Sequence, residues 1–78
     1  MWLLTDLGQR INTEKLSVYF VSKQQGTPGV WELNVLLQEM DQPLMLAVGP
    51  KEEVEAIAAW LDKALGVVEV GKKNSRFR

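Results

Sequence analysis

Apolar and polar residues alternate with a period of two along much of the chain, which predicts a series of short β-strands. The clearest strand covers residues 16–23, and shorter ones are expected at 2–5, 10–11 and 44–48, each bounded by turn residues. The two faces of the strand at 16–23 carry different side chains, namely Leu16, Val18 and Phe20 on one face and Tyr19 and Val21 on the other.

The segment 30–39 fits two patterns. As a strand it places Trp31, Leu33, Val35 and Leu37 on one face, whereas Val30, Leu33, Leu37 and Met40 also fit a helical stripe. We favour the strand, because a helix would leave Trp31 and Val35 in water. The loop at 24–29, with its Gly and Pro residues after a strand, also indicates a hairpin.

A helix is predicted from Pro50 to Leu65, because Pro is favoured in the first helical turn and Gly66 is a good residue to end the helix. Counted at about 100° per residue, one apolar arc carries Val54, Ile57, Ala58, Leu61, Ala64 and Leu65, with Trp60 at its margin. The β-branched segment 67–70 is expected to add a short edge strand.

These elements predict an α+β domain in which an antiparallel β-meander of four to five strands packs on one C-terminal amphipathic helix, followed by that short edge strand. Residues 1–70 form the single domain, and residues 71–78 form a basic, flexible tail. The helix is expected to cover the face with Leu16, Val18 and Phe20. In simple register, the opposite face then carries four apolar residues without a partner, which are Tyr19, Val21, Leu36 and Met45.

The composition removes several kinds of chemistry. The 78 residues include no cysteine and no histidine, which excludes disulfides, thiolate nucleophiles and zinc sites of the usual ligand types. No serine has the setting of a nucleophile elbow, and Glu39 and Asp41 are better explained as a solvated turn than as ligands of a cation. We therefore expect no enzyme activity, no cofactor and no small-molecule substrate.

The sequence also bears on location. The apolar start of the chain meets Asp6 at once, and no apolar run of about 18 residues follows. We expect neither a signal peptide nor a membrane anchor. We therefore expect the protein to be cytoplasmic.

Charge is unevenly distributed along the chain. Residues 1–70 hold five basic and ten acidic side chains, a formal charge of −5, while the tail carries +4. The tail residues that could contact nucleic acid or an acidic partner are Lys72, Lys73, Arg76, Phe77 and Arg78. The alternative is that this end of the chain only aids solubility.

The function that these patterns favour is a small non-catalytic protein–protein interaction or regulatory module that acts through the face or edge of its sheet. Its partner would be a second copy, giving a homodimer, or another protein. One alternative is a nucleic-acid-binding accessory protein that uses the basic tail. A third reading is an enzyme subunit whose chemistry resides in its partner.

Overall fold

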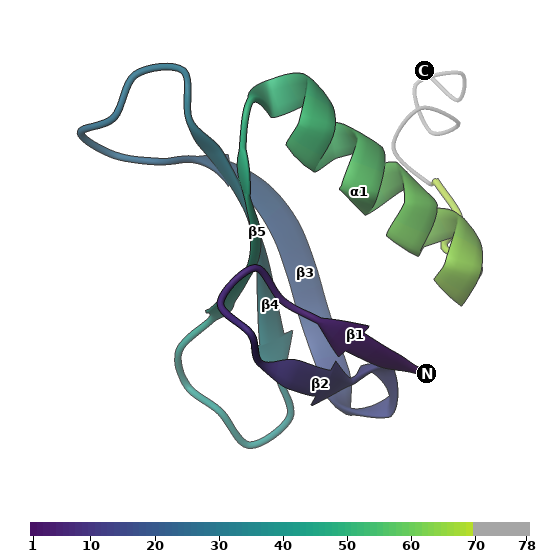
Figure 1. The fold of residues 1–78 in the computed structure, drawn as a ribbon. Coiled ribbons are helices and arrows are strands. Elements are labelled where there is room, and N and C mark those ends of the chain that lie inside the picture. The colour runs from purple at the N-terminus through teal and green to yellow at the C-terminus, as the bar shows by residue number, and fades with distance from the viewer. Residues whose placement is uncertain (70–78) are drawn as a thin grey trace, which may run out of the picture.

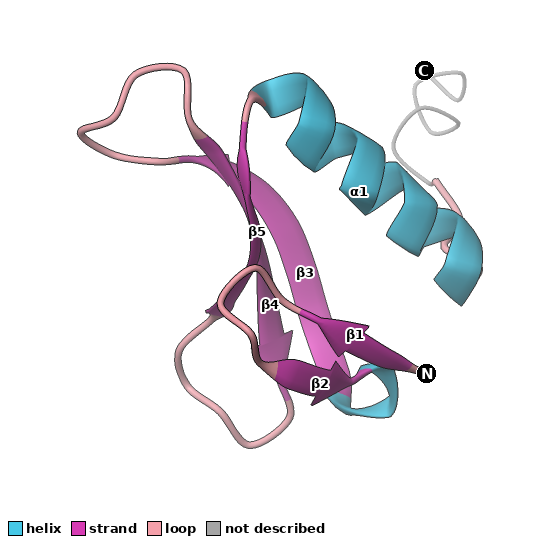
Figure 2. Cartoon of the chain, in the orientation of Figure 1, coloured by secondary structure: helices cyan, strands magenta, loops and turns pink. Residues whose placement is uncertain are grey.

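The structure is a computed structural model that describes residues 1–69. It confirms the α+β class, with five strands, a single 3₁₀ turn and one helix (Figures 1 and 2). The elements in chain order are β1 (Trp2–Leu4), β2 (Arg10–Asn12), η1 (Thr13–Lys15), β3 (Leu16–Lys23), β4 (Trp31–Leu37), β5 (Leu44–Gly49) and α1 (Lys51–Leu65). Within residues 1–69, no helix has both the length and the apolar character that crossing a membrane requires.

The strands form two sheets rather than one continuous meander. β3, β4 and β5 make a three-stranded antiparallel sheet in that order, and β1 pairs with β2 in a separate two-stranded ribbon. The ribbon turns at Thr5, whose hydroxyl accepts hydrogen bonds from the backbone N–H groups of Leu7 and Gln9. The side chain of Asn12 caps η1 by accepting from the N–H of Glu14, as an Asn in that position should.

The ambiguous segment is a strand, as predicted, and it lies at the centre of the larger sheet. The connection from β3 to β4 passes through Gly26 and Gly29, both with φ of +79°, a backbone conformation that favours glycine. The helical alternative is excluded because Leu33 and Val35 lie fully buried between β3 and β5 in the ladder.

Two β-bulges decide which side chains meet the helix. One lies in β3 between Leu16 and Val18, and the other shifts the β4–β5 register so that Leu46 has no direct partner on β4. Because a bulge inserts one residue, the alternation changes phase at each of these points. The predicted face of β3 is therefore wrong: Leu16 packs against the core, but Val18 and Phe20 lie on the opposite side.

The helix ends where the sequence predicts and begins one residue later than predicted, at Lys51. Pro50 is its N-cap, and Gly66 ends it in the left-handed conformation with φ of 71°. The N–H groups of Gly66 and Val67 donate to the carbonyls of Lys63 and Asp62, which closes the last turn. Residues 67–69 form no strand, contrary to prediction, and the closing turn already uses the N–H of Val67; Val70 lies outside the described residues.

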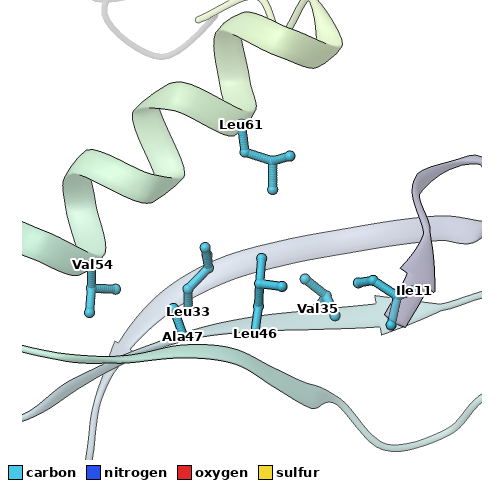
Figure 3. Close-up of a cluster of buried hydrophobic side chains, with 7 residues drawn as sticks. All are labelled: Ile11, Leu33, Val35, Leu46, Ala47, Val54 and Leu61. Atoms are coloured by element: carbon cyan, nitrogen blue, oxygen red, sulfur yellow. The ribbon is translucent and has the colours of Figure 1, made fainter. Parts of the chain in front are cut away.

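The core lies between the helix and one face of the larger sheet (Figure 3). Its buried side chains come from the ribbon, the sheet and the helix, and they are Ile11, Leu33, Val35, Leu46, Ala47, Val54 and Leu61. The helix contributes less than its apolar arc predicts, because Ile57 and Leu65 are exposed by 39% and 37%. A sheet of three strands is too narrow to cover the whole arc.

Replacing Leu61 by Ala should lower the free energy of unfolding by about 2–5 kcal/mol, because its side chain is fully buried and the cavity cannot close completely. Ile57→Ala is the matched control on the same helix and should cost less than about 1.5 kcal/mol, since that side chain is already partly in water. Urea denaturation followed by circular dichroism measures both changes. Equal losses would contradict the described position of the helix.

Candidate functional site

The four residues predicted to share an unpartnered face do not lie together. Tyr19 and Val21 oppose Val35 and Leu33 of β4 and pack against the core on the helix side. Leu36 and Met45 point to the opposite side of the sheet. The grouping is wrong because it assumed a simple register, and the bulges in β3 and β5 break that register.

The structure assembles a different set of residues on the side of the sheet away from the helix, which we call the open face. Side chains of directly paired residues share a face, so the ladder register defines its membership. Its three rows are Val18 with Leu36, then Phe20 with Asn34 and Met45, then Ser22 with Glu32 and Val48.

The apolar members of the open face remain partly or largely accessible to water. Val18, Phe20 and Val48 are exposed by 50%, 43% and 37%, while Leu36 and Met45 are half-buried. Such exposure of several neighbouring apolar side chains on one sheet face is uncommon without a binding role. The alternation in the sequence predicts Leu36 and Met45 on this surface, but it misses Val18, Phe20 and Val48.

A polar pair lies at the centre of the open face. Asn34 is only 9% exposed, and its Nδ2 donates a hydrogen bond of 2.9 Å to the Oγ of Ser22. Phe20 and Met45 flank Asn34 on the neighbouring strands. The amide oxygen of Asn34 and the hydroxyl of Ser22 can therefore offer hydrogen bonds to a bound molecule at a fixed position.

The open face is poor in charge. Glu32 is its single ionisable residue, and its carboxylate accepts a hydrogen bond of 2.9 Å from Nε2 of Gln24. Lysine and arginine are absent from the three rows. The face therefore lacks the cations that would attract a phosphate backbone.

The helix side of the sheet is closed by polar contacts as well as by the core. The phenol of Tyr19 donates a hydrogen bond of 2.5 Å to Oδ1 of Asp62 on α1. Burial and this carboxylate together raise the pKa of Tyr19 to about 12. At the other end, Nζ of Lys51 lies 5.0 Å from the ring centre of Trp31, so the start of the helix is also fixed to the sheet.

The outer edge of β5 is occupied by the ribbon. The N–H of Asp6 donates to the carbonyl of Leu46, and the N–H of Val48 donates to Oδ2 of Asp6, each at 2.9 Å. These bonds satisfy the backbone at the bulge, where the regular ladder is interrupted. They also place the ribbon against one edge of the sheet.

A second apolar surface lies between the ribbon and the helix. It is a groove of about 250 Å³ whose lining includes Leu3, Leu4, Ile57 and Trp60, with Leu61 at its base. Leu4 and Trp60 are exposed by 62% and 54%. The groove is apolar and open, but nothing in the described residues indicates what would occupy it.

The described part of the chain holds no group of three or more carboxylates that could bind a metal ion. Glu39 lies in the β4–β5 loop with a φ of +70°, a left-handed conformation that occurs in turns. The predicted tail contacts lie outside the described residues; they are Lys72, Lys73, Arg76, Phe77 and Arg78.

Residues 1–69 define a small α+β arrangement in which a helix covers one face of the larger sheet and no described element covers the other. No protein-family model matches the chain, and its comparison with curated proteins and with solved structures gives no match.

Because of Tyr19, the free energy of unfolding of the domain should fall at alkaline pH. Its pKa is about 12 in the folded chain, against about 10 when unfolded, so the stabilisation is complete below pH 10. This stabilisation is lost as the pH rises through 12, because Tyr19 gives up its proton at a lower pH in the unfolded chain than in the folded chain. In Tyr19→Phe, which also loses the bond to Asp62, this part of the pH dependence should disappear.

Urea denaturation of both proteins between about pH 9 and pH 12 checks this expectation. The tyrosinate absorbance of the folded wild-type protein gives the pKa directly. A titration near the ordinary value would contradict the contact between Tyr19 and Asp62.

Proposed function

We propose that this domain is a non-catalytic interaction module that binds another protein surface through its open face. The observation that carries the proposal is the exposure of Val18, Phe20 and Val48 beside Leu36 and Met45, on the face that the helix does not cover. Burying such a surface gives association a favourable free energy of roughly 25 cal/mol per Å² of apolar area, before the costs of ordering.

The arrangement of the open face supports specificity as well as affinity. Apolar side chains surround the fixed Asn34–Ser22 pair, so a partner must bring an apolar surface with a matching hydrogen-bonding group at its centre. A partner without that group would leave Asn34 buried without a full set of hydrogen bonds, which costs binding free energy. In this proposal the chain carries out no catalytic step.

The expected partner is a protein surface of low charge, or one with a cation opposite Glu32. Nucleic acid is disfavoured at this face, because its one charged residue is a carboxylate. We place this activity in the cytoplasm, with which a chain free of cysteine is compatible.

Val48→Lys should weaken partner binding, because the new cation would be desolvated in the interface. Val48 lies on β5, partly exposed, so the substitution should leave the fold intact. The immobilised wild-type chain is used to capture proteins from an extract of its source cells. The affinity of any stoichiometric partner is then measured for each variant, with an expected loss of about tenfold or more.

Trp60→Ser is the matched control, since it removes an exposed apolar side chain from the groove on the other side of the molecule. It should bind the same partner as wild type. Loss of binding in Trp60→Ser but not in Val48→Lys would move the interaction to the groove and refute the proposal.

A second candidate function is supported by the segregation of charge. The last seven residues carry four cations, whereas the described residues sum to −5. Lys72, Lys73, Arg76 and Arg78 could contact about four phosphates, with Phe77 stacking on a base. This supports weak binding of nucleic acid without sequence specificity.

Deletion of residues 71–78 should abolish that binding, because the remaining chain is acidic. Titration of a labelled single-stranded DNA checks it, and the logarithm of the binding constant should fall with the logarithm of salt concentration with a slope of roughly −3. A flat titration at low salt would remove this candidate. Binding that survives the deletion would assign it to another surface.

A further inference from the structure

β3 forms an edge of the larger sheet that the ribbon does not occupy. The strand order is β3-β4-β5, and the hydrogen bonds from the ribbon reach β5, at Leu46 and Val48. Among residues 1–69, no backbone hydrogen bond from outside the sheet joins the outer side of β3. Its eight residues make β3 the longest strand, so it offers the longest unpaired edge.

Beyond the bulge near its start, this edge lacks the usual protection against pairing. Natural edge strands are often short, or carry charges or proline along their length. The regular part of β3 after its bulge reads Val-Tyr-Phe-Val-Ser, without charge, proline or glycine, and Lys23 comes only at its end. The composition of this edge is that of a strand which has a partner.

The hydrogen-bonding direction of each residue in β3 follows from the ladder. The N–H of Gln24 donates to the carbonyl of Val30, which marks the two as a hydrogen-bonded pair. Such pairs alternate along antiparallel strands, so Phe20 and Ser22 also direct their backbone groups toward β4. Tyr19, Val21 and Lys23 therefore present N–H and C=O groups outward.

When two copies pair these outward groups in an antiparallel arrangement, the twofold axis is perpendicular to the sheet. Each residue must then lie opposite a residue whose side chain points to the same face. The register centred on Phe20 satisfies this condition. It places Phe20 opposite Phe20 of the second copy, Tyr19 opposite Val21, and Val18 opposite Ser22. An axis at Tyr19 would instead place Val21 and Lys23 opposite the bulge and the 3₁₀ turn of the second copy, where the strand is no longer regular.

We propose that two copies of this chain pair through β3, with Phe20 on the twofold axis, to give a continuous six-stranded sheet. This inference goes beyond the proposed function, because it places a second copy at the edge of the sheet and not on the open face. The two Phe20 rings would form an aromatic cross-strand pair, and the open faces of both copies would join into one surface. A further partner would bind across that joined surface.

Cysteine substitution tests the register directly, because the chain contains no cysteine of its own. At a pair that is not hydrogen-bonded, opposing Cα atoms lie about 4.5 Å apart, within the range of a disulfide. Phe20→Cys should therefore form a covalent dimer in a glutathione redox buffer. In Val18→Cys the two thiols would be separated by four residues along the strands, about 13 Å, and should not cross-link.

The readout is the intact mass of each variant under non-reducing conditions, after circular dichroism has shown that it is folded. Cross-linking of Phe20→Cys alone supports the inference. Equal cross-linking of both variants, or of neither, would overturn it.

Sedimentation equilibrium of the full chain gives a second, independent measurement. The wild-type protein should be a dimer, and Phe20→Lys should raise the dimer dissociation constant about tenfold or more, because it places two cations opposite each other. Val48→Lys, on the same face but on β5, should leave the dimer unchanged. A wild-type protein that stays monomeric at high concentration would overturn the inference.

The outcomes separate this inference from the proposed function. If the wild-type chain is a monomer but Val48→Lys loses a captured partner, the β3 pairing is wrong and the open-face module stands. If the dimer forms as described but no open-face substitution affects partner binding, the pairing stands and the binding role of the open face fails.

Discussion

The two β-bulges of the larger sheet control the chemistry of both its faces. Without the bulge in β3, Leu16 would leave the core; without the bulge in β5, Leu44 and Ala47 could not both point toward the helix. Each inserted residue changes the phase of a strand relative to its neighbour. The bulges therefore also decide which side chains make up the open face. Residues that alternate with the core-facing ones along each strand point to the side away from the helix.

The same constraint connects the ribbon to the sheet. The bulge in β5 interrupts the regular ladder near Leu46, and Asp6 supplies the backbone and carboxylate groups that bond there. The ribbon is thus fixed beside β5, where Ile11 reaches the core (Figure 3). An asymmetric sheet results, in which β5 is accompanied by the ribbon, whereas no element of residues 1–69 pairs with the outer edge of β3.

Polar groups give this small core a definite geometry. Tyr19 and Asp62 join β3 to the last turns of the helix, and Lys51 over Trp31 joins the first turn to β4. On the other side of the sheet, the Asn34–Ser22 bond fixes a polar centre among apolar neighbours. Such partly buried hydrogen bonds contribute little net stability, but they are costly to leave unmade, so they favour one arrangement over its competitors.

The sequence by itself determined the α+β class, the strand at 31–37 and both ends of the helix, because Pro50, Gly66 and the alternating apolar residues act locally. It also identified Leu36 and Met45 as apolar residues outside the core. Only the tertiary structure decided which face of β3 is covered, and hence that Phe20 rather than Tyr19 lies on the open face. The physical reason is that a strand has two faces of similar apolar character here, and a one-residue bulge, which depends on pairing between distant segments, chooses between them.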